Sequence, residues 1–196
     1  MSALAVEPGP ARGSDWDELV RVWKETDAPE GSKVEIIEGI VTVPPTPSRD
    51  HNTTAAKLAR SLYSVIPEDW EVYQTLGIEF PSTQNLFVPD IAVVPVKYAV
   101  GPGNRVAAEH VELVAEITSK NNANHDRVKK VRGYAMGGIP LYLLLDPWHS
   151  GRPTATLYGE PTDGTYRVLA SGEYGEVLKV PAPFSLELDT GTFPIT

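Results

Sequence analysis

Two acidic side chains lie within or at the end of apolar, β-rich runs, where a charge is costly unless it is compensated. Asp90 follows Pro89 in the middle of the run 86–95, and Glu116 lies near the end of VELVAEIT, residues 111–118. Mg²⁺ and Mn²⁺ prefer carboxylate oxygens, and two carboxylates with a substrate phosphate are a common magnesium arrangement. The pair predicts a divalent metal site. The alternative is a pair of structural acids at strand ends.

The segment after Glu116 supports the metal-site interpretation. Asp126, Lys130 and Tyr134 are spaced i, i+4 and i+8, which places them on one face of a helix. Lys130 can then point back toward the strand that carries Glu116. An ammonium there would orient an attacking water or stabilise charge that develops on phosphorus. The alternative is an ordinary surface ion pair between Asp126 and Lys130, worth about 0.3–0.5 kcal/mol.

Basic residues gather in the same part of the chain. Of the 17 Lys and Arg residues, five fall between positions 120 and 132. They are Lys120, Arg127, Lys129, Lys130 and Arg132. We expect Lys120, Arg127 and Lys129 to bind substrate phosphate. A solvated helix face is the alternative interpretation of this cluster.

Composition removes several other classes of protein. The 196 residues carry a net charge of -9, which argues against non-specific coating of nucleic acid. Because the chain has no cysteine, it is not a zinc finger, a disulfide-rich scaffold, an iron–sulfur protein or a cysteine-nucleophile enzyme. No G-x-S-x-G elbow, P-loop or dinucleotide glycine fingerprint occurs. The sequence has neither a membrane-length apolar run nor a signal-peptide pattern, so we expect no membrane contact and a cytoplasmic location.

The elements that must position these side chains alternate between helix and strand. Apolar spacing predicts helices over 14–28, with Ser14 as N-cap, and over 49–66 and 124–136, the last stopped by Gly137 and Gly138. Strand-like runs are 33–43, read as a hairpin around Glu38-Gly39, and 71–80, 86–95, 111–118 and the buried run 141–145, with hairpins over the last fifty residues. We expect residues 1–13 to be a flexible lead-in. Residues 14–196 should form one α/β (α+β) domain with a central mixed sheet flanked by helices.

An ordered series of residues resembles the Uma-two family of predicted endonucleases, in the PD-(D/E)XK nuclease superfamily. The stretches that carry the resemblance are VEIIEGIV, PDIAVVP, AEITS and HDRVKKVRGYAMGGIPLYLLLDP, and it runs from about Trp16 to the closing PAPFSLELDTGTF. Its most specific part is the series Glu35, His51, Pro89-Asp90, Glu116, Ser119, Asp126, Lys130, Tyr134, Gly138-Ile139-Pro140 and Tyr142.

The resemblance implies a restriction-endonuclease-like fold and hydrolysis of phosphodiester bonds in DNA with Mg²⁺ or Mn²⁺. Asp90 and Glu116 match the metal-binding acids of the superfamily, and Glu35 matches its additional acid. The usual lysine lies two residues after the second acid, where this chain has Thr118. Lys130 is therefore the candidate for that role. The catalytic set implied is Glu35, Asp90, Glu116 and Lys130.

Further expectations concern supporting residues, assembly and competing functions. His51 and Asp126 are candidate supporting residues, whereas Tyr134 and Tyr142 are expected to pack in the core. Glu35 has an alternative as a solvent-facing acid on an edge hairpin. Nucleases of this superfamily often act as dimers, so a homodimer is one expectation. Two other functions stay open: an inactive nuclease-fold module for binding or assembly, and a hydrolase of RNA or another phosphate ester.

Overall fold

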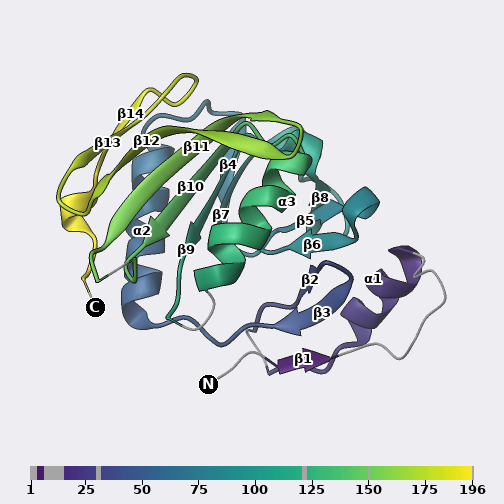
Figure 1. Cartoon of the computed structure of the whole chain (residues 1–196). Helices are drawn as coiled ribbons and strands as arrows, with labels where there is room; N and C mark the ends of the chain where they lie inside the picture. The colour runs from purple at the N-terminus through teal and green to yellow at the C-terminus, as the bar shows by residue number, and fades with distance from the viewer. Residues whose placement is uncertain (1–3, 7–15, 30–31, 121–122, 150, 196) are drawn as a thin grey trace.

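The computed structural model describes residues 4–6, 16–29, 32–120, 123–149 and 151–195. Among these residues, two six-stranded sheets and a separate two-stranded hairpin carry most of the regular structure (Figure 1). Each six-stranded sheet contains one parallel pair, β5–β8 in the first and β9–β10 in the second, while its other pairs are antiparallel. The predicted mixed α+β class is confirmed, but the chain builds a second sheet that the sequence did not reveal.

The first sheet holds the predicted hairpin. Its strands, in spatial order, are β1 (Leu4–Val6), β3 (Ile40–Val43), β2 (Glu35–Ile37), β6 (Asn85–Phe87), β5 (Gly77–Phe80) and β8 (Arg105–Ala107). The turn between β2 and β3 has φ of 52° at Glu38 and 79° at Gly39. Two consecutive positive φ values are what a tight two-residue hairpin turn requires. β1 lies inside the expected lead-in, and the rest of that segment is outside the described residues.

The second sheet carries the buried strand predicted at 141–145. Its strands, in spatial order, are β12 (Thr165–Glu173), β11 (Thr154–Thr162), β10 (Leu141–Asp146), β9 (Leu113–Ile117), β7 (Ile91–Pro95) and β4 (Trp70–Tyr73). All six residues of β10 are buried, as expected for a central strand. The predicted C-terminal hairpins are β11–β12 and the separate pair β13 (Val177–Val180) and β14 (Leu186–Asp189).

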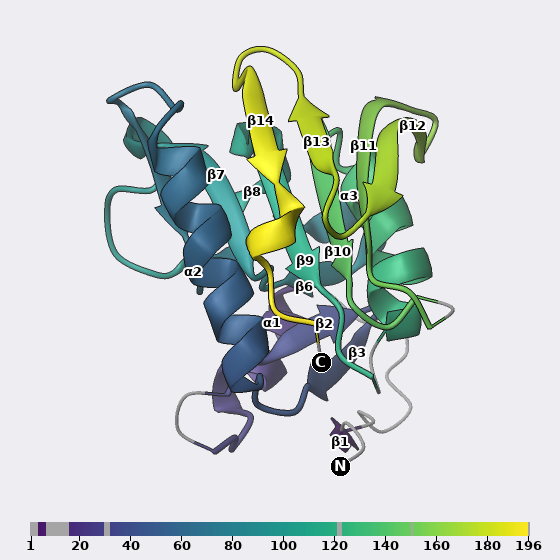
Figure 2. The same ribbon diagram turned by 90° about the vertical axis from the view of Figure 1, so that its left-hand side faces the viewer.

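Both faces of the second sheet are covered, which explains its near-continuous apolar strands. In β9, Leu113, Ala115 and Ile117 point to one face, while Val114 and Glu116 point to the other. The first face packs against helix α2 (Arg49–Tyr63) and the β13–β14 hairpin, which lie side by side in Figure 2. The second face packs against helix α3 (Val131–Met136) and the first sheet. Glu116 thus faces the layer formed by helix α3 and the first sheet.

The helices agree with the sequence in place and differ in detail. Helix α1 is Trp16–Glu25 and covers the first sheet through Leu19, while its expected N-cap, Ser14, is outside the described residues. Helix α2 begins at Arg49, as predicted, and ends at Tyr63 rather than at 66. The structure shows Ser48 as its N-cap. The segment predicted as one helix over 124–136 is a π-helical turn, His125–Lys130, followed by α3. Short 3₁₀ turns lie at Pro81–Thr83, Val96–Tyr98, Ala108–His110 and Thr190–Thr192.

Two runs expected to be single strands are each divided between the sheets. The run 71–80 becomes β4 in the second sheet and β5 in the first, and the run 86–95 becomes β6 and β7. Pro89 lies at the second division, where it cannot donate a ladder hydrogen bond. Asp90 therefore lies at the crossing between the sheets rather than in the middle of a strand. Among the described residues, no helix is long and apolar enough to cross a membrane.

Candidate active site

The register of the second sheet brings the two predicted metal ligands together. β7 and β9 are antiparallel, with Ile91 opposite Ala115, so one step further along this register Asp90 lies opposite Glu116. The backbone N–H of Ile117 donates to Oδ2 of Asp90 at 2.8 Å. The start of one strand and the end of its neighbour thus place both carboxylates at the same end of the sheet.

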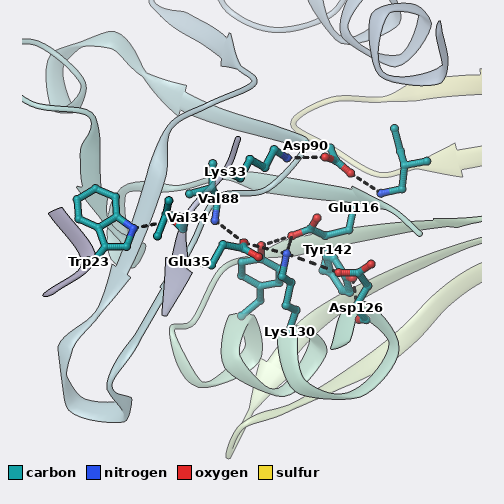
Figure 3. A network of polar contacts seen from close by, with 12 residues as sticks. Trp23, Lys33, Val34, Glu35, Val88, Asp90, Glu116, Asp126, Lys130 and Tyr142 are labelled. Atoms are coloured by element: carbon teal, nitrogen blue, oxygen red, sulfur yellow. Dashed lines mark hydrogen bonds and ion pairs between the residues drawn. The ribbon is translucent and has the colours of Figure 1, made fainter. Parts of the chain in front are cut away.

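Lys130 reaches this end of the sheet from the π-helical turn and lies between three carboxylates (Figure 3). Its Nζ is 2.9 Å from Oε1 of Glu35, 3.0 Å from Oε1 of Glu116 and 3.5 Å from Oδ1 of Asp126. Its residue exposure is only 5%, so this is a buried network and not the exposed ion pair considered as the alternative. Glu35, at 3% exposure, is likewise not a solvent-facing acid.

Further hydrogen bonds hold the carboxylates in place. The backbone N–H of Val88 donates to Oε1 of Glu35 at 2.7 Å, and the Tyr134 hydroxyl donates to Oε1 of Glu116 at 2.6 Å. The Tyr142 hydroxyl donates to the backbone carbonyl of Asp126 at 2.9 Å. Both tyrosines are fully buried, as expected for core aromatics, and their hydroxyls also orient the site.

Asp90 has two partners from outside the second sheet. Nζ of Lys33 is 2.5 Å from its Oδ1, and Nε2 of His51 is 2.9 Å from its Oδ2. His51 therefore contacts the site, as expected of a supporting residue, whereas Lys33 was not predicted. The spacing between Lys33 and Glu35 could have revealed Lys33, because residues i and i+2 of an extended segment face the same side. Nδ1 of His51 is buried without a hydrogen-bond partner among the described residues.

Burial and charge set the protonation of the network. Burial acts to raise the pKa of Asp90, but the Lys33 charge and the hydrogen bond from His51 outweigh it and hold the pKa well below its usual range. Burial raises the pKa of Glu116, and raises that of Asp126 further, with Lys130 opposing only in part. Burial would lower the pKa of Lys130, yet the surrounding carboxylates raise it well above its usual value. Lys130 is therefore a permanent cation at neutral pH.

The residues fit a divalent cation by donor type and by charge. Four buried carboxylates (Glu35, Asp90, Glu116 and Asp126) face two ammonium groups, Lys33 and Lys130. Within the described part of the chain, no three Asp, Glu or His side chains form a group that could hold a metal ion by themselves. Magnesium sites commonly use only one or two carboxylates and leave other positions to water and substrate phosphate. Asp90 and Glu116 match that pattern.

The three predicted substrate-binding residues are not gathered at the site. Arg127 donates to Asp146 from Nε at 2.7 Å and from Nη2 at 2.9 Å, so its guanidinium takes part in the fold. Nζ of Lys129 is 2.8 Å from Oε2 of Glu38 in the hairpin turn. Lys120 does line the pocket described below. Asp146 was not identified from the sequence as a site residue. It follows the apolar run 141–145 directly, much as Glu116 lies near the end of the run 111–118.

A pocket of about 360 Å³ opens over these carboxylates. Its floor includes Glu35, Asp90, Glu116, Asp126 and Lys130. The lining also includes the proline-rich segment 44–48, Lys120 and Trp148. The volume lies within the range of about 300–1,000 Å³ typical of small-ligand sites. The charged network is therefore accessible to a substrate of nucleotide size.

Comparison with solved structures defines the fold class. The chain is similar to the structure titled "Crystal structure of a putative nuclease belonging to DUF820 from Anabaena variabilis ATCC 29413", with a TM-score of 0.70 and 21% sequence identity. The match covers 92% of this chain and 97% of that chain. The fold is thus that of the restriction-endonuclease-like α+β proteins.

Comparison with family models defines the family. The Uma2 model, described as "Putative restriction endonuclease", matches residues 16–191, and the chain belongs to this family. No curated protein matches. Membership places the chain among restriction-type nucleases, a class of hydrolases that act on nucleic acid and generally use a divalent metal.

Proposed function

We propose that this chain is a divalent-metal-dependent endonuclease that hydrolyses phosphodiester bonds of DNA. The observation that carries the proposal is the buried Lys130 ammonium, within 3.5 Å of three carboxylates and beside the Asp90–Glu116 pair, at the floor of an open pocket. A purely structural ion pair needs neither four buried acids nor an opening above them.

Asp90 and Glu116 are the proposed ligands of Mg²⁺ or Mn²⁺. Such an ion supplies Lewis acidity toward a phosphoryl oxygen and lowers the pKa of a bound water. Glu35 holds Lys130 in position through Oε1. Because Lys130 stays protonated, we assign it the stabilisation of negative charge on the phosphoryl group rather than the removal of a proton from water.

An inactive nuclease-fold module is the second candidate function, and one contact favours it. Nζ of Lys33 lies 2.5 Å from Oδ1 of Asp90, where it already neutralises a proposed metal ligand. If this ion pair persists in the presence of metal, the pocket would bind a partner without catalysis. Competition between Lys33 and the cation therefore separates the two functions.

Metal binding is tested by isothermal titration of Mg²⁺ and Mn²⁺ into wild type, Asp90→Asn and Glu116→Gln. We expect binding in the wild type and its loss in both variants. Glu68→Gln removes an exposed acid outside the pocket and should bind as the wild type does. Equal binding in the wild type and both site variants would overturn the assignment of the ligands.

Catalysis is tested with supercoiled plasmid, single-stranded circular DNA and RNA in the presence of Mn²⁺. We expect DNA cutting that Glu116→Gln and Lys130→Met abolish, whereas Lys179→Met, which changes an exposed lysine on β13, retains it. Cutting of RNA alone would replace DNA by RNA as the substrate. Metal binding without cutting of any of the three would favour the inactive module.

Assembly and location complete the proposal. If the chain cuts both strands of a duplex at one position, it needs two active sites, so we include a homodimer for that substrate, which light scattering of the purified chain tests. A monomer that cuts only single strands would remove that part of the proposal. The proposed location is the cytoplasm, where fractionation of expressing cells should find the chain.

A further inference from the structure

One wall of the pocket is aromatic and basic, in contrast to its acidic floor. β9 and β10 are parallel, so the residues that follow their carboxyl ends lie side by side. Lys120 follows β9 and Trp148 follows β10, and the Lys120 ammonium lies 5.9 Å from the centre of the indole ring. Lys120 is exposed and Trp148 is half-buried, so both can meet a ligand in the pocket.

Asp146 fixes this wall relative to the catalytic floor. It is only 2% exposed, and its Oδ1 accepts hydrogen bonds from the Thr118 hydroxyl at 2.7 Å and from the Trp148 backbone N–H at 3.1 Å. Thr118 is two residues from Glu116 on the same chain. The position of Trp148 is therefore coupled to the proposed metal ligand by hydrogen bonds, with Arg127 holding Asp146 from the helix side.

The chemistry of this wall suits one nucleotide. An indole face stacks on the π-face of any base. The exposed Lys120 ammonium, which lies over this ring, can swing aside to pair with the adjoining phosphate. Inside a duplex both faces of a base are covered by its neighbours, so only an unpaired base can stack on a side chain. The pocket lining also contains Pro44, Pro45 and Pro47, whose fixed φ angles make that segment stiff. A volume of about 360 Å³ is within the range of small-ligand sites and suits a group of about the size of one nucleotide.

Charge supports the same substrate form. Duplex binding depends on many Lys and Arg contacts along the phosphate backbone. Among the described pocket-lining residues, Lys33 and Lys130 are paired with carboxylates, and Lys120 is the remaining lysine. One cation next to one aromatic ring matches one stacked nucleotide better than a long duplex.

We propose that Trp148 and Lys120 form a nucleotide subsite that stacks one unpaired base beside the scissile phosphate and so directs the site to single-stranded DNA segments. This inference rests on the proposed function and names its substrate form. Trp148 is a specificity-determining residue in this arrangement, and Asp146 is a positioning residue that acts through it.

The test measures binding of a fluorescein-labelled oligothymidylate whose phosphorothioate linkages resist cleavage, in the presence of Mg²⁺. Its comparison probes are an abasic oligomer with the same backbone and a hairpin duplex. The variants are Trp148→Ala and Trp148→Phe, with Trp70→Phe as matched control, because Trp70 packs edge-on against Phe184 in the core and does not line the pocket. Lys120→Ala tests the phosphate contact.

We expect Trp148→Ala to weaken oligothymidylate binding by about 5- to 150-fold, the effect of losing one base–aromatic stack. Trp148→Phe should keep most of the affinity, and Trp70→Phe all of it. Binding of the abasic oligomer should not change in Trp148→Ala, since no base is present to stack. Lys120→Ala should lower the slope of log affinity against log salt by about 1 or slightly less.

Other results would overturn the subsite. These are unchanged oligothymidylate binding in Trp148→Ala, an equal loss for the abasic oligomer, or a larger loss for the duplex. An equal loss for the abasic oligomer would mean that the variant disturbs the wall rather than a stack. Failure of the proposed function is separate: a chain that binds through Trp148 but cuts nothing refutes the nuclease and leaves the subsite intact.

Discussion

Replacing Lys130 by Met should destabilise the metal-free protein strongly. The substitution removes the ammonium that lies 2.9 Å from Glu35, 3.0 Å from Glu116 and 3.5 Å from Asp126, and leaves three buried carboxylates facing one another. Breaking a buried ion pair by removing one partner costs about 3–5 kcal/mol, because the remaining charge stays out of water. We expect a loss of unfolding free energy in that range at mildly alkaline pH.

The loss should shrink as the pH falls. Burial already raises the pKa values of Glu116 and Asp126 above those of the unfolded chain, and Lys130 is the main nearby charge that opposes this. Without the Lys130 ammonium, the folded-state pKa values of both carboxyl groups rise further. A carboxyl group with a raised folded-state pKa contributes stability that is present below its unfolded pKa and is lost as the pH rises through the folded one. Protonation of Glu116 and Asp126 therefore reduces the loss of unfolding free energy in Lys130→Met at acidic pH.

Urea unfolding in EDTA at about pH 5 and about pH 8 measures both effects. Lys179→Met serves as the control for loss of a lysine at the surface, where it should cost at most about 1 kcal/mol. The double variant Lys130→Met/Glu116→Gln should recover part of the loss, since it removes one of the stranded charges. A loss that is below about 1 kcal/mol, or equal at both pH values, would refute a buried ionic network.

Three further outcomes follow from other contacts. Gly133→Ala should destabilise the protein by about 1–3 kcal/mol in urea unfolding, because the added Cβ would lie 2.5 Å from the Phe87 ring. The double variant Gly133→Ala/Phe87→Leu should relieve this clash, whereas a loss equal to the sum of the two single losses would contradict it. Burial acts to raise the pKa of Asp146, but hydrogen bonds, chiefly from Arg127, leave it lowered, so this carboxylate contributes stability that is lost as the pH falls through its folded value. Arg127→Ala should therefore shift the acid-unfolding midpoint, followed by circular dichroism, to higher pH, and a shift to lower pH would be inconsistent with this ion pair. Lys33→Met should bind Mg²⁺ more tightly in calorimetry, because an ammonium no longer competes for the carboxylate; weaker binding would show that Lys33 does not compete.

The sequence predicted the parts of the site that depend on local periodicity. The i, i+4 spacing of Asp126 and Lys130 survives in a π-helical turn, with their charged atoms 3.5 Å apart. The acids at 90 and 116 meet because antiparallel strands bring the start of one beside the end of the next. The first relation follows from chain geometry over a few residues, which a single sequence contains. The second depends on the long-range pairing of β7 with β9, and the family resemblance implied it.

The partners that the sequence did not predict depend on long-range pairing. Lys33 meets Asp90 across 57 positions, and the division of residues 71–80 and 86–95 between two sheets depends on which strands pair. Local strand propensity is the same on either side of each division, so it does not show where the chain changes sheets. Arg127 was assigned to substrate from its charge, while the position of its guanidinium is set by Asp146 at the end of strand β10.

Two backbone amides at the site donate to side chains rather than to carbonyl groups. The N–H of Val88 donates to Glu35, from the first sheet, and the N–H of Ile117 donates to Asp90, at the crossing between the sheets. Hydrogen exchange at these two amides therefore reports whether the segment 88–90, where the chain passes from the first sheet to the second, keeps its place at the site. A condition that speeds exchange at Val88 and Ile117 while sparing the central strand β10 would mark a protein that is folded overall but in which the crossing segment no longer holds Glu35 and Asp90 in place.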